Sequence, residues 1–169
     1  MMHTELYYQF SLILSAILMV VAAMSDAVRF RIPNLVCLAI LLTFPLFVYT
    51  APVTVPWVEH IITFAIILVL GYQLFARGFA GAGDIKLLAV IGLWAGPNYW
   101  PHFLFITAAT GGILSLGIGG LTILRHKLSK KAGKVDFAKT PIPYGVAIAV
   151  GGLCTLALLS HPDLLASKV

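Results

Sequence analysis

The sequence is poor in charge. Only 10% of its 169 residues are Asp, Glu, Lys or Arg, while 60% are apolar, and the mean hydropathy is +1.01. An ordinary soluble domain carries roughly 25% charged residues. A soluble chain of this length could not cover its surface with so few polar groups, so the composition excludes a soluble globular domain, a disordered chain and a coiled coil. The net charge of +5 does not indicate nucleic-acid binding, because membrane proteins use basic residues to set their orientation.

Cysteine is also scarce. The two cysteines, Cys37 and Cys154, each lie inside an apolar run and form no CxxC pair, which excludes a zinc ribbon and a thioredoxin-like redox motif. No cluster of His, Cys or paired carboxylates has metal-ligand spacing, so we expect neither a metal nor a cofactor. The first residues contain Glu5 and no basic residue, and the apolar run that follows is too long for the core of a signal peptide.

Long apolar runs are abundant instead. Six of them approach the length that crosses a membrane as a helix, which predicts an all-α integral membrane protein: one transmembrane domain over residues 1–169, built as a bundle of six helices. The fourth run is short, so we expect it to begin in a polar pocket or to be supported by its neighbours. The predicted spans are 6–25, 35–51, 57–76, 85–97, 102–124 and 143–160.

The linkers between these spans alternate in charge. Ten of the eleven basic residues lie in the first, third and fifth linkers, and the second and fourth linkers contain none. Cytoplasmic loops of membrane proteins collect Lys and Arg. The sequence therefore predicts that these three linkers face the cytoplasm and that both termini face outward. The fifth linker, 125–142, is a strongly basic loop in this interpretation.

Two of the six acidic residues have no ordinary explanation. Asp26 directly follows the first apolar run, and Asp84 ends the string Gly81-Ala-Gly83-Asp84 just before the fourth. Both are expected at cytoplasmic helix ends, at similar depth, where ionisable groups are costly and usually functional. Two carboxyl groups held close together share a proton and can activate a water, which is the chemistry of an aspartic protease. Glycines let the chain approach a partner helix or a substrate closely.

Three strings resemble, in order, the motifs of the bacterial type IV prepilin peptidase family: Asp26-Ala-Val-Arg-Phe-Arg-Ile-Pro-Asn34, Gly81-Ala-Gly-Asp-Ile-Lys86 and Pro141-Ile-Pro-Tyr-Gly145. The resemblance implies a GxGD-type intramembrane aspartic endopeptidase of the inner membrane. Such an enzyme removes the basic leader from prepilins and pseudopilins at the cytoplasmic face and so supports pilus assembly or secretion. It implies Asp26 and Asp84 as the catalytic pair. The implied supporting residues are Gly81, Gly83, Lys86, Arg31, Pro33 and Asn34, with Pro143, Tyr144 and Gly145 as possible substrate-contacting or structural positions.

The resemblance is to the compact form of the family. Longer members carry a cytoplasmic zinc domain with paired CxxC motifs between the first two spans, and also methylate the new pilin N-terminus. Here that linker has about ten residues and no CxxC, so we expect no N-methyltransferase activity and a Flp/Tad-type enzyme. The implied partners are prepilin and pseudopilin substrates and the lipid bilayer, with no nucleic acid. The oligomeric state and the division of roles between the aspartates stay open.

Two other functions are compatible with the same residues. A small ion-coupled transporter could use membrane carboxylates as proton carriers, although both aspartates are expected at one interface and transporter sites usually lie near the midplane. A structural membrane subunit of a secretion or pilus assembly could instead pair the aspartates with Arg29 or Lys86. A presenilin-type peptidase shares the GxGD string but lacks the first motif.

Overall fold

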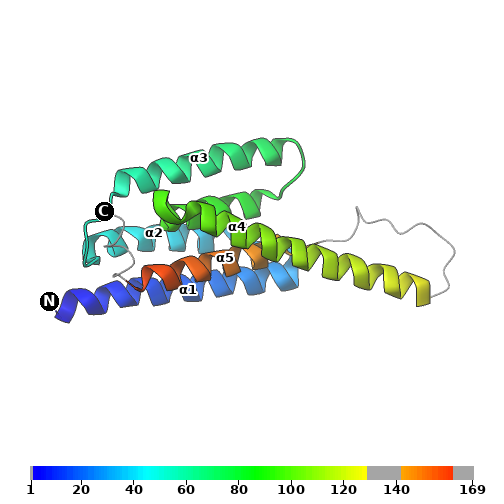
Figure 1. The fold of residues 1–169 in the computed structure, drawn as a ribbon, viewed down its shortest axis with the longest axis horizontal. Coiled ribbons are helices and arrows are strands. Elements are labelled where there is room, and N and C mark those ends of the chain that lie inside the picture. The colour runs from blue at the N-terminus through cyan, green and yellow to red at the C-terminus, as the bar shows by residue number, and fades with distance from the viewer. Residues whose placement is uncertain (1, 129–141, 162–169) are drawn as a thin grey trace.

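The computed structural model describes residues 2–128 and 142–161, which form helices joined by short connections (Figure 1). Helix α4 packs against α2, α3 and α5, and α1 packs against α2 and α5. The all-helical class predicted from the sequence is therefore confirmed. The helices are α1 (Met2–Arg29), α2 (Asn34–Thr50), α3 (Trp57–Ala76), α4 (Ala82–Leu128) and α5 (Tyr144–Leu159).

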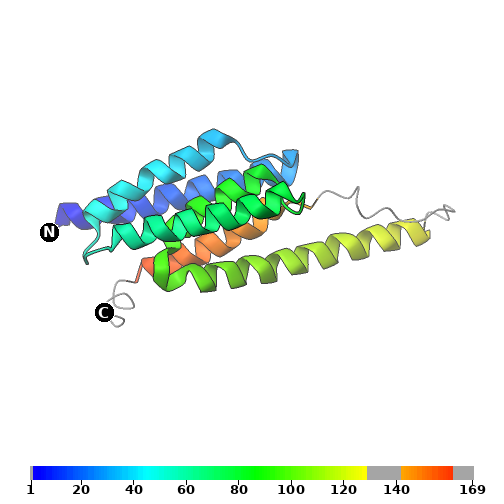
Figure 2. The ribbon, with the colours of Figure 1, turned by 90° about the horizontal axis from the view of Figure 1, so that it is seen from above.

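Helix α4 contains both the fourth and the fifth expected spans. It runs along the bundle, reverses direction near Gly96 and returns without an intervening loop (Figure 2). Gly96 has φ 58° and ψ −170°, a conformation that side-chain-bearing residues rarely adopt. Pro97 then starts the returning segment, at a position whose N–H would have no partner within that segment. The expectation of a separate linker at 97–101 is wrong, because these residues are helical. The structure thus has five helices among its described residues, and the count of six spans stays a prediction.

The outer surface of the bundle is apolar. Three helical segments, Glu5–Arg29, Trp57–Ala76 and Ala82–Leu124, are long and apolar enough to cross a membrane, and α2 and α5 are shorter apolar helices. Large apolar side chains such as Leu70 and Leu116 are exposed. So extensive an apolar surface indicates contact with lipid rather than water. Together these features identify a membrane protein.

The interior of the bundle contains polar groups that form hydrogen bonds from one helix to another. The hydroxyl groups of Ser15 in α1 and Thr43 in α2 lie 2.8 Å apart, and Trp94 Nε1 of α4 donates to the Ile40 carbonyl oxygen of α2 at 3.2 Å. Such interhelical hydrogen bonds hold helices together where lipid supplies no hydrophobic driving force. They fix the position of α2 between α1 and α4.

Two tight connections bring the predicted site motifs to one end of the bundle (Figure 1). After α1, Phe30 adopts a left-handed φ of 50°, and Ser25 Oγ donates to the Arg31 carbonyl oxygen at 2.8 Å, which reverses the chain just beyond Asp26. After α3, Gly78 has φ 77°, and Phe79 N–H donates to the Leu74 carbonyl at 3.0 Å, as in a Schellman motif. The start of α5 lies at the same end. The expected basic loop at 125–142 falls largely outside the described residues.

Candidate active site

Asp26 lies in the last turn of α1 and is only 5% exposed. Its Oδ2 accepts a hydrogen bond from the backbone N–H of Gly145 at 2.7 Å. This N–H group belongs to the first turn of α5, whose N-cap residue, Pro143, makes no side-chain cap. The first N–H groups of a helix need an acceptor. Asp26 therefore caps α5 from a different helix.

Asp84 lies in the first turn of α4 and is half-buried. Its carboxyl group turns back and accepts a hydrogen bond from the backbone N–H of Gly81, the arrangement that a first-turn carboxylate makes in a capping box. A Cβ on Gly81 would lie 2.8 Å from Asp84 Oδ2, whereas a Cβ on Gly83 would meet its nearest neighbour, Ile32 Cβ, at 3.4 Å. Of the two motif glycines, Gly81 is the one that makes room for the carboxyl group.

The two aspartates meet at one cavity. Both side chains line a space of about 410 Å³, which we name the aspartate cavity, and the charge of Asp26 acts on Asp84. Two neighbouring carboxyl groups cannot both ionise easily and titrate as a unit. One proton shared between them gives a base and an acid in the same space. The lining residues are Asp26, Phe30, Arg31, Ile32, Asn34, Gly81, Ala82, Gly83, Asp84, Lys86 and Ile142.

Of the other predicted site residues in the first two motifs, some line the aspartate cavity and Pro33 does not. Arg31, Asn34 and Lys86 line the aspartate cavity, and Lys86 Nζ donates to Asn34 Oδ1 at 3.0 Å, so the first two sequence motifs are joined by a hydrogen bond between α4 and α2. Pro33 is the N-cap residue of α2 and does not line the cavity.

The third motif contributes to the site through its backbone. Pro143 precedes α5 as its N-cap residue. The Tyr144 hydroxyl lies 3.4 Å from Ser115 Oγ, and Tyr144 does not line the aspartate cavity. Gly145 contacts a candidate catalytic group, Asp26, through its N–H. The sequence pattern marked this segment but could not indicate a backbone donor, because any residue other than proline carries one.

The sequence analysis missed four apolar or small residues of the cavity. Phe30 and Ile32 belong to the α1–α2 connection, Ala82 opens α4, and Ile142 precedes α5. Each of the four lies within one of the three motifs. This position was the one feature of the sequence that could have indicated them as cavity residues. They narrow the space around the carboxyl groups and reduce their contact with water.

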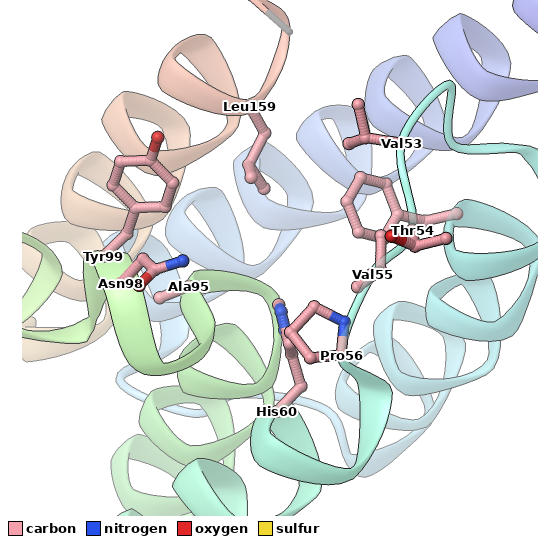
Figure 3. A pocket seen from close by; sticks show the side chains of 10 residues that line it. Val53, Thr54, Val55, Pro56, His60, Ala95, Asn98, Tyr99 and Leu159 are labelled. Carbon is pink, nitrogen blue, oxygen red and sulfur yellow. The ribbon is translucent and has the colours of Figure 1, made fainter. Parts of the chain in front are cut away.

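A second cavity, also of about 410 Å³, lies at the opposite end of the bundle and is lined mostly by apolar side chains (Figure 3). We name it the His60 cavity. His60 Nδ1 lies 2.7 Å from the Leu93 carbonyl oxygen, so Nδ1 carries the proton in this hydrogen bond. In an unbroken helix that carbonyl would accept from residue 97, which is a proline without an N–H. The imidazole therefore stabilises the break in α4.

Among residues 2–128 and 142–161 there is no group of three or more His, Cys, Asp or Glu side chains that could hold a metal ion. The donor set at the aspartate cavity consists of two carboxyl groups with cationic side chains nearby. Such a set suits proton transfer.

The fold and the site define a class: a helical membrane protein with two interacting aspartates at one end of its bundle. The chain belongs to the type IV leader peptidase family, whose sequence model matches residues 13–116, more than half of the chain. It is 36% identical over 76 residues to the prepilin leader peptidase/N-methyltransferase of Aeromonas salmonicida, a stretch that covers 45% of this chain and 22% of the relative. To the protein of the same name in Burkholderia pseudomallei it is 33% identical over 76 residues, or 45% of this chain and 21% of the relative.

The chain is also similar to a membrane transporter. It is 36% identical over 93 residues to the branched-chain amino acid permease BrnQ of Escherichia coli, a stretch that covers 54% of this chain and 19% of the permease. The matched regions thus span about a fifth of the length of these curated relatives. No solved structure matches the chain.

Proposed function

We propose that this protein is a membrane-embedded aspartic endopeptidase that removes the basic leader peptide from type IV prepilins and pseudopilins. The observation that carries the proposal is the aspartate cavity, where Asp26 and Asp84, from two separate motifs of the chain, line one space. Membership of the type IV leader peptidase family supplies the reaction class. Substrates with an apolar helix suit an enzyme whose own outer surface is apolar.

In the proposed reaction one aspartate is ionised and the other is protonated. The ionised carboxylate takes a proton from water as the water oxygen bonds to the scissile carbonyl carbon, and the protonated carboxyl group gives its proton to the carbonyl oxygen. The proton taken from water then passes to the amide nitrogen as the C–N bond breaks. The carbonyl bond re-forms and returns the second proton to its carboxyl group. One water is consumed, and the products are the leader with a free carboxyl end and the pilin with a free amino end.

We place the site at the cytoplasmic face of the bacterial inner membrane, with six transmembrane segments and both termini outside. Asp26 lies in the last turn of α1 and Asp84 in the first turn of α4. The α1–α2 and α3–α4 connections lie at this same end of the bundle (Figure 1), and these linkers carry basic residues. A prepilin with its apolar helix in the bilayer and its basic leader in the cytoplasm would present the scissile bond at this depth.

We further propose that the enzyme is of the compact Flp/Tad type and does not methylate its product. Helix α1 ends at Arg29 and α2 begins at Asn34, and this connection has no room for a zinc domain. The supporting roles that we assign to Arg31, Asn34 and Lys86 are part of this proposal, as is the role of Gly81 in making room for Asp84.

The proposal is tested by replacing each aspartate with asparagine, Asp26→Asn and Asp84→Asn, and following the removal of the leader from a prepilin expressed in the same cells. Asparagine keeps the size of the side chain but cannot share a proton, so we expect unprocessed prepilin to accumulate with either variant. The matched control is Glu59→Gln, the same chemical change at an exposed carboxyl group on α3, which should process normally. Normal processing by a stably expressed Asp26→Asn or Asp84→Asn variant would reject the proposal.

One observation favours a second candidate function, the uptake of a branched-chain amino acid: the similarity to the permease BrnQ. In that case the aspartates would carry protons. The same purified protein can be reconstituted in vesicles under a proton gradient and supplied with labelled leucine. Uptake that depends on the gradient and is lost in Asp84→Asn, without prepilin cleavage, would favour transport over proteolysis.

A further inference from the structure

The contact between α1 and the start of α5 bears on which of the two aspartates acts as the base. Gly145 N–H donates to Asp26 Oδ2 at 2.7 Å. Asp84 receives its backbone hydrogen bond from Gly81. The N-terminus of a helix carries partial positive charge and stabilises a nearby carboxylate. Asp84 also lies at a helix N-terminus, that of α4, but its backbone donor is Gly81, which precedes that helix, whereas Asp26 accepts a short hydrogen bond from the first turn of α5.

The structure leaves no space for a side chain at Gly145. A Cβ at this position would lie 2.8 Å from Asp26 Oδ2 and 2.9 Å from Asp26 Cβ, and 2.8 Å from Ile32 Cδ1. Any larger residue would push the α5 turn away from the carboxyl group. The absence of a side chain at Gly145 is therefore what allows the backbone N–H to reach Asp26.

We infer that Gly145 is a positioning residue whose backbone N–H holds Asp26 as the ionised base, which leaves Asp84 as the protonated acid; this rests on the proposed function. When two carboxyl groups share one proton, the proton resides on the group whose anion is less stabilised. The other charged groups around Asp26 are Asp84 and Lys86 from α4 and Arg31 from the α1–α2 connection, all of which line the cavity. Lys86 is engaged with Asn34, and the α5 backbone donates directly to Asp26 at 2.7 Å.

The test is the variant Gly145→Ala, compared with Gly152→Ala in the same helix. At Gly152 a Cβ would meet Met19 Sδ at 2.8 Å and Ile91 Cγ2 at 2.9 Å, so both substitutions introduce a clash of equal severity, but only the first is at Asp26. We expect Gly145→Ala to lower kcat for prepilin cleavage about 100-fold with little change in KM, since a catalytic group displaced by about 1 Å typically costs that much. Gly152→Ala should keep the kcat of the folded enzyme within a few-fold of the parent value.

The pH dependence gives the readout that a purely structural role would not affect. Loss of the hydrogen bond to the ionised form of the base should shift the acid limb of the kcat profile upward by roughly one pH unit in Gly145→Ala and not in Gly152→Ala. If Gly145→Ala does not fold, the double variant with Ile32→Val, which removes Ile32 Cδ1, allows the same comparison. The inference fails if Gly145→Ala matches Gly152→Ala in both kcat and pH profile. Failure of the parent enzyme to cleave any prepilin would instead reject the proposed function.

Discussion

A buried hydrogen bond between His60 and the Leu93 carbonyl stabilises the break in α4. The Leu93 carbonyl is buried, has lost its helical partner to Pro97 and is satisfied by His60 Nδ1 at 2.7 Å. His60→Phe keeps a ring of similar size next to Phe44, whose centroid lies 5.4 Å from the imidazole, but removes the donor. Leaving a buried carbonyl unsatisfied costs about 1–3 kcal/mol. His60→Phe should therefore reduce the free energy of unfolding by about that amount.

A second substitution at the same position separates packing from hydrogen bonding. His60→Ala removes the donor and also leaves a cavity beneath Gly96, whose Cα region packs directly on the imidazole. Because cavity formation adds to the lost hydrogen bond, this variant should be less stable than His60→Phe. The assay is the thermal midpoint in detergent micelles, with His102→Ala, at an exposed histidine, as the control.

The site lies at the other end of the bundle, so the folded fraction of His60→Phe should still cleave prepilin. A His60→Phe protein as stable as the parent would refute the claim that this hydrogen bond stabilises the break in α4.

Three further outcomes follow from the site. Gly81→Ala should lower kcat more than Gly83→Ala. The methyl group at position 81 would lie 2.8 Å from Asp84 Oδ2, whereas the one at position 83 would make an ordinary contact at 3.4 Å. Steady-state cleavage rates of the two variants check this, and equal effects would contradict it. Asp26→Leu should be about 1 kcal/mol less stable than Asp26→Asn, because asparagine can still accept the α5 N–H group as a cap and leucine cannot; thermal midpoints decide. Lys86→Met should change the free energy of unfolding by less than about 0.5 kcal/mol, because the hydrogen bond from Lys86 to Asn34 is exposed. A large drop in the thermal midpoint would contradict this and show that the contact holds α2 and α4 together.

The sequence predicted the helix positions well because membrane-spanning helices are specified by length and hydropathy alone. The third expected span, 57–76, coincides with α3, and α2 differs from its span by one residue at each end. The expected break between the fourth and fifth spans lies at Gly96, but residues 97–101, which were expected to form a linker, are helical. Prolines and aromatic residues there are typical of a loop, but a glycine with positive φ followed by proline reverses the chain while both sides stay helical.

The site was predictable in its residue types and not in its contacts. Asp26 and Asp84 stand out because so few charged residues occur in this chain. The capping of α5 by Asp26 was not predictable, because it depends on how α1 and α5 pack, and the donor is a backbone N–H that leaves no trace in residue chemistry. The same is true of the hydrogen bond between Lys86 and Asn34, which requires α2 and α4 to be adjacent.

The most direct test of the account is the mass of a prepilin after incubation with the purified, membrane-reconstituted protein. The account predicts that the parent protein and Glu59→Gln convert the prepilin to two products whose masses correspond to the free leader and to the pilin with a new N-terminus, and that Asp26→Asn and Asp84→Asn leave it intact. Cleavage by either asparagine variant at the parent rate would contradict the central claim that these two aspartates perform the hydrolysis.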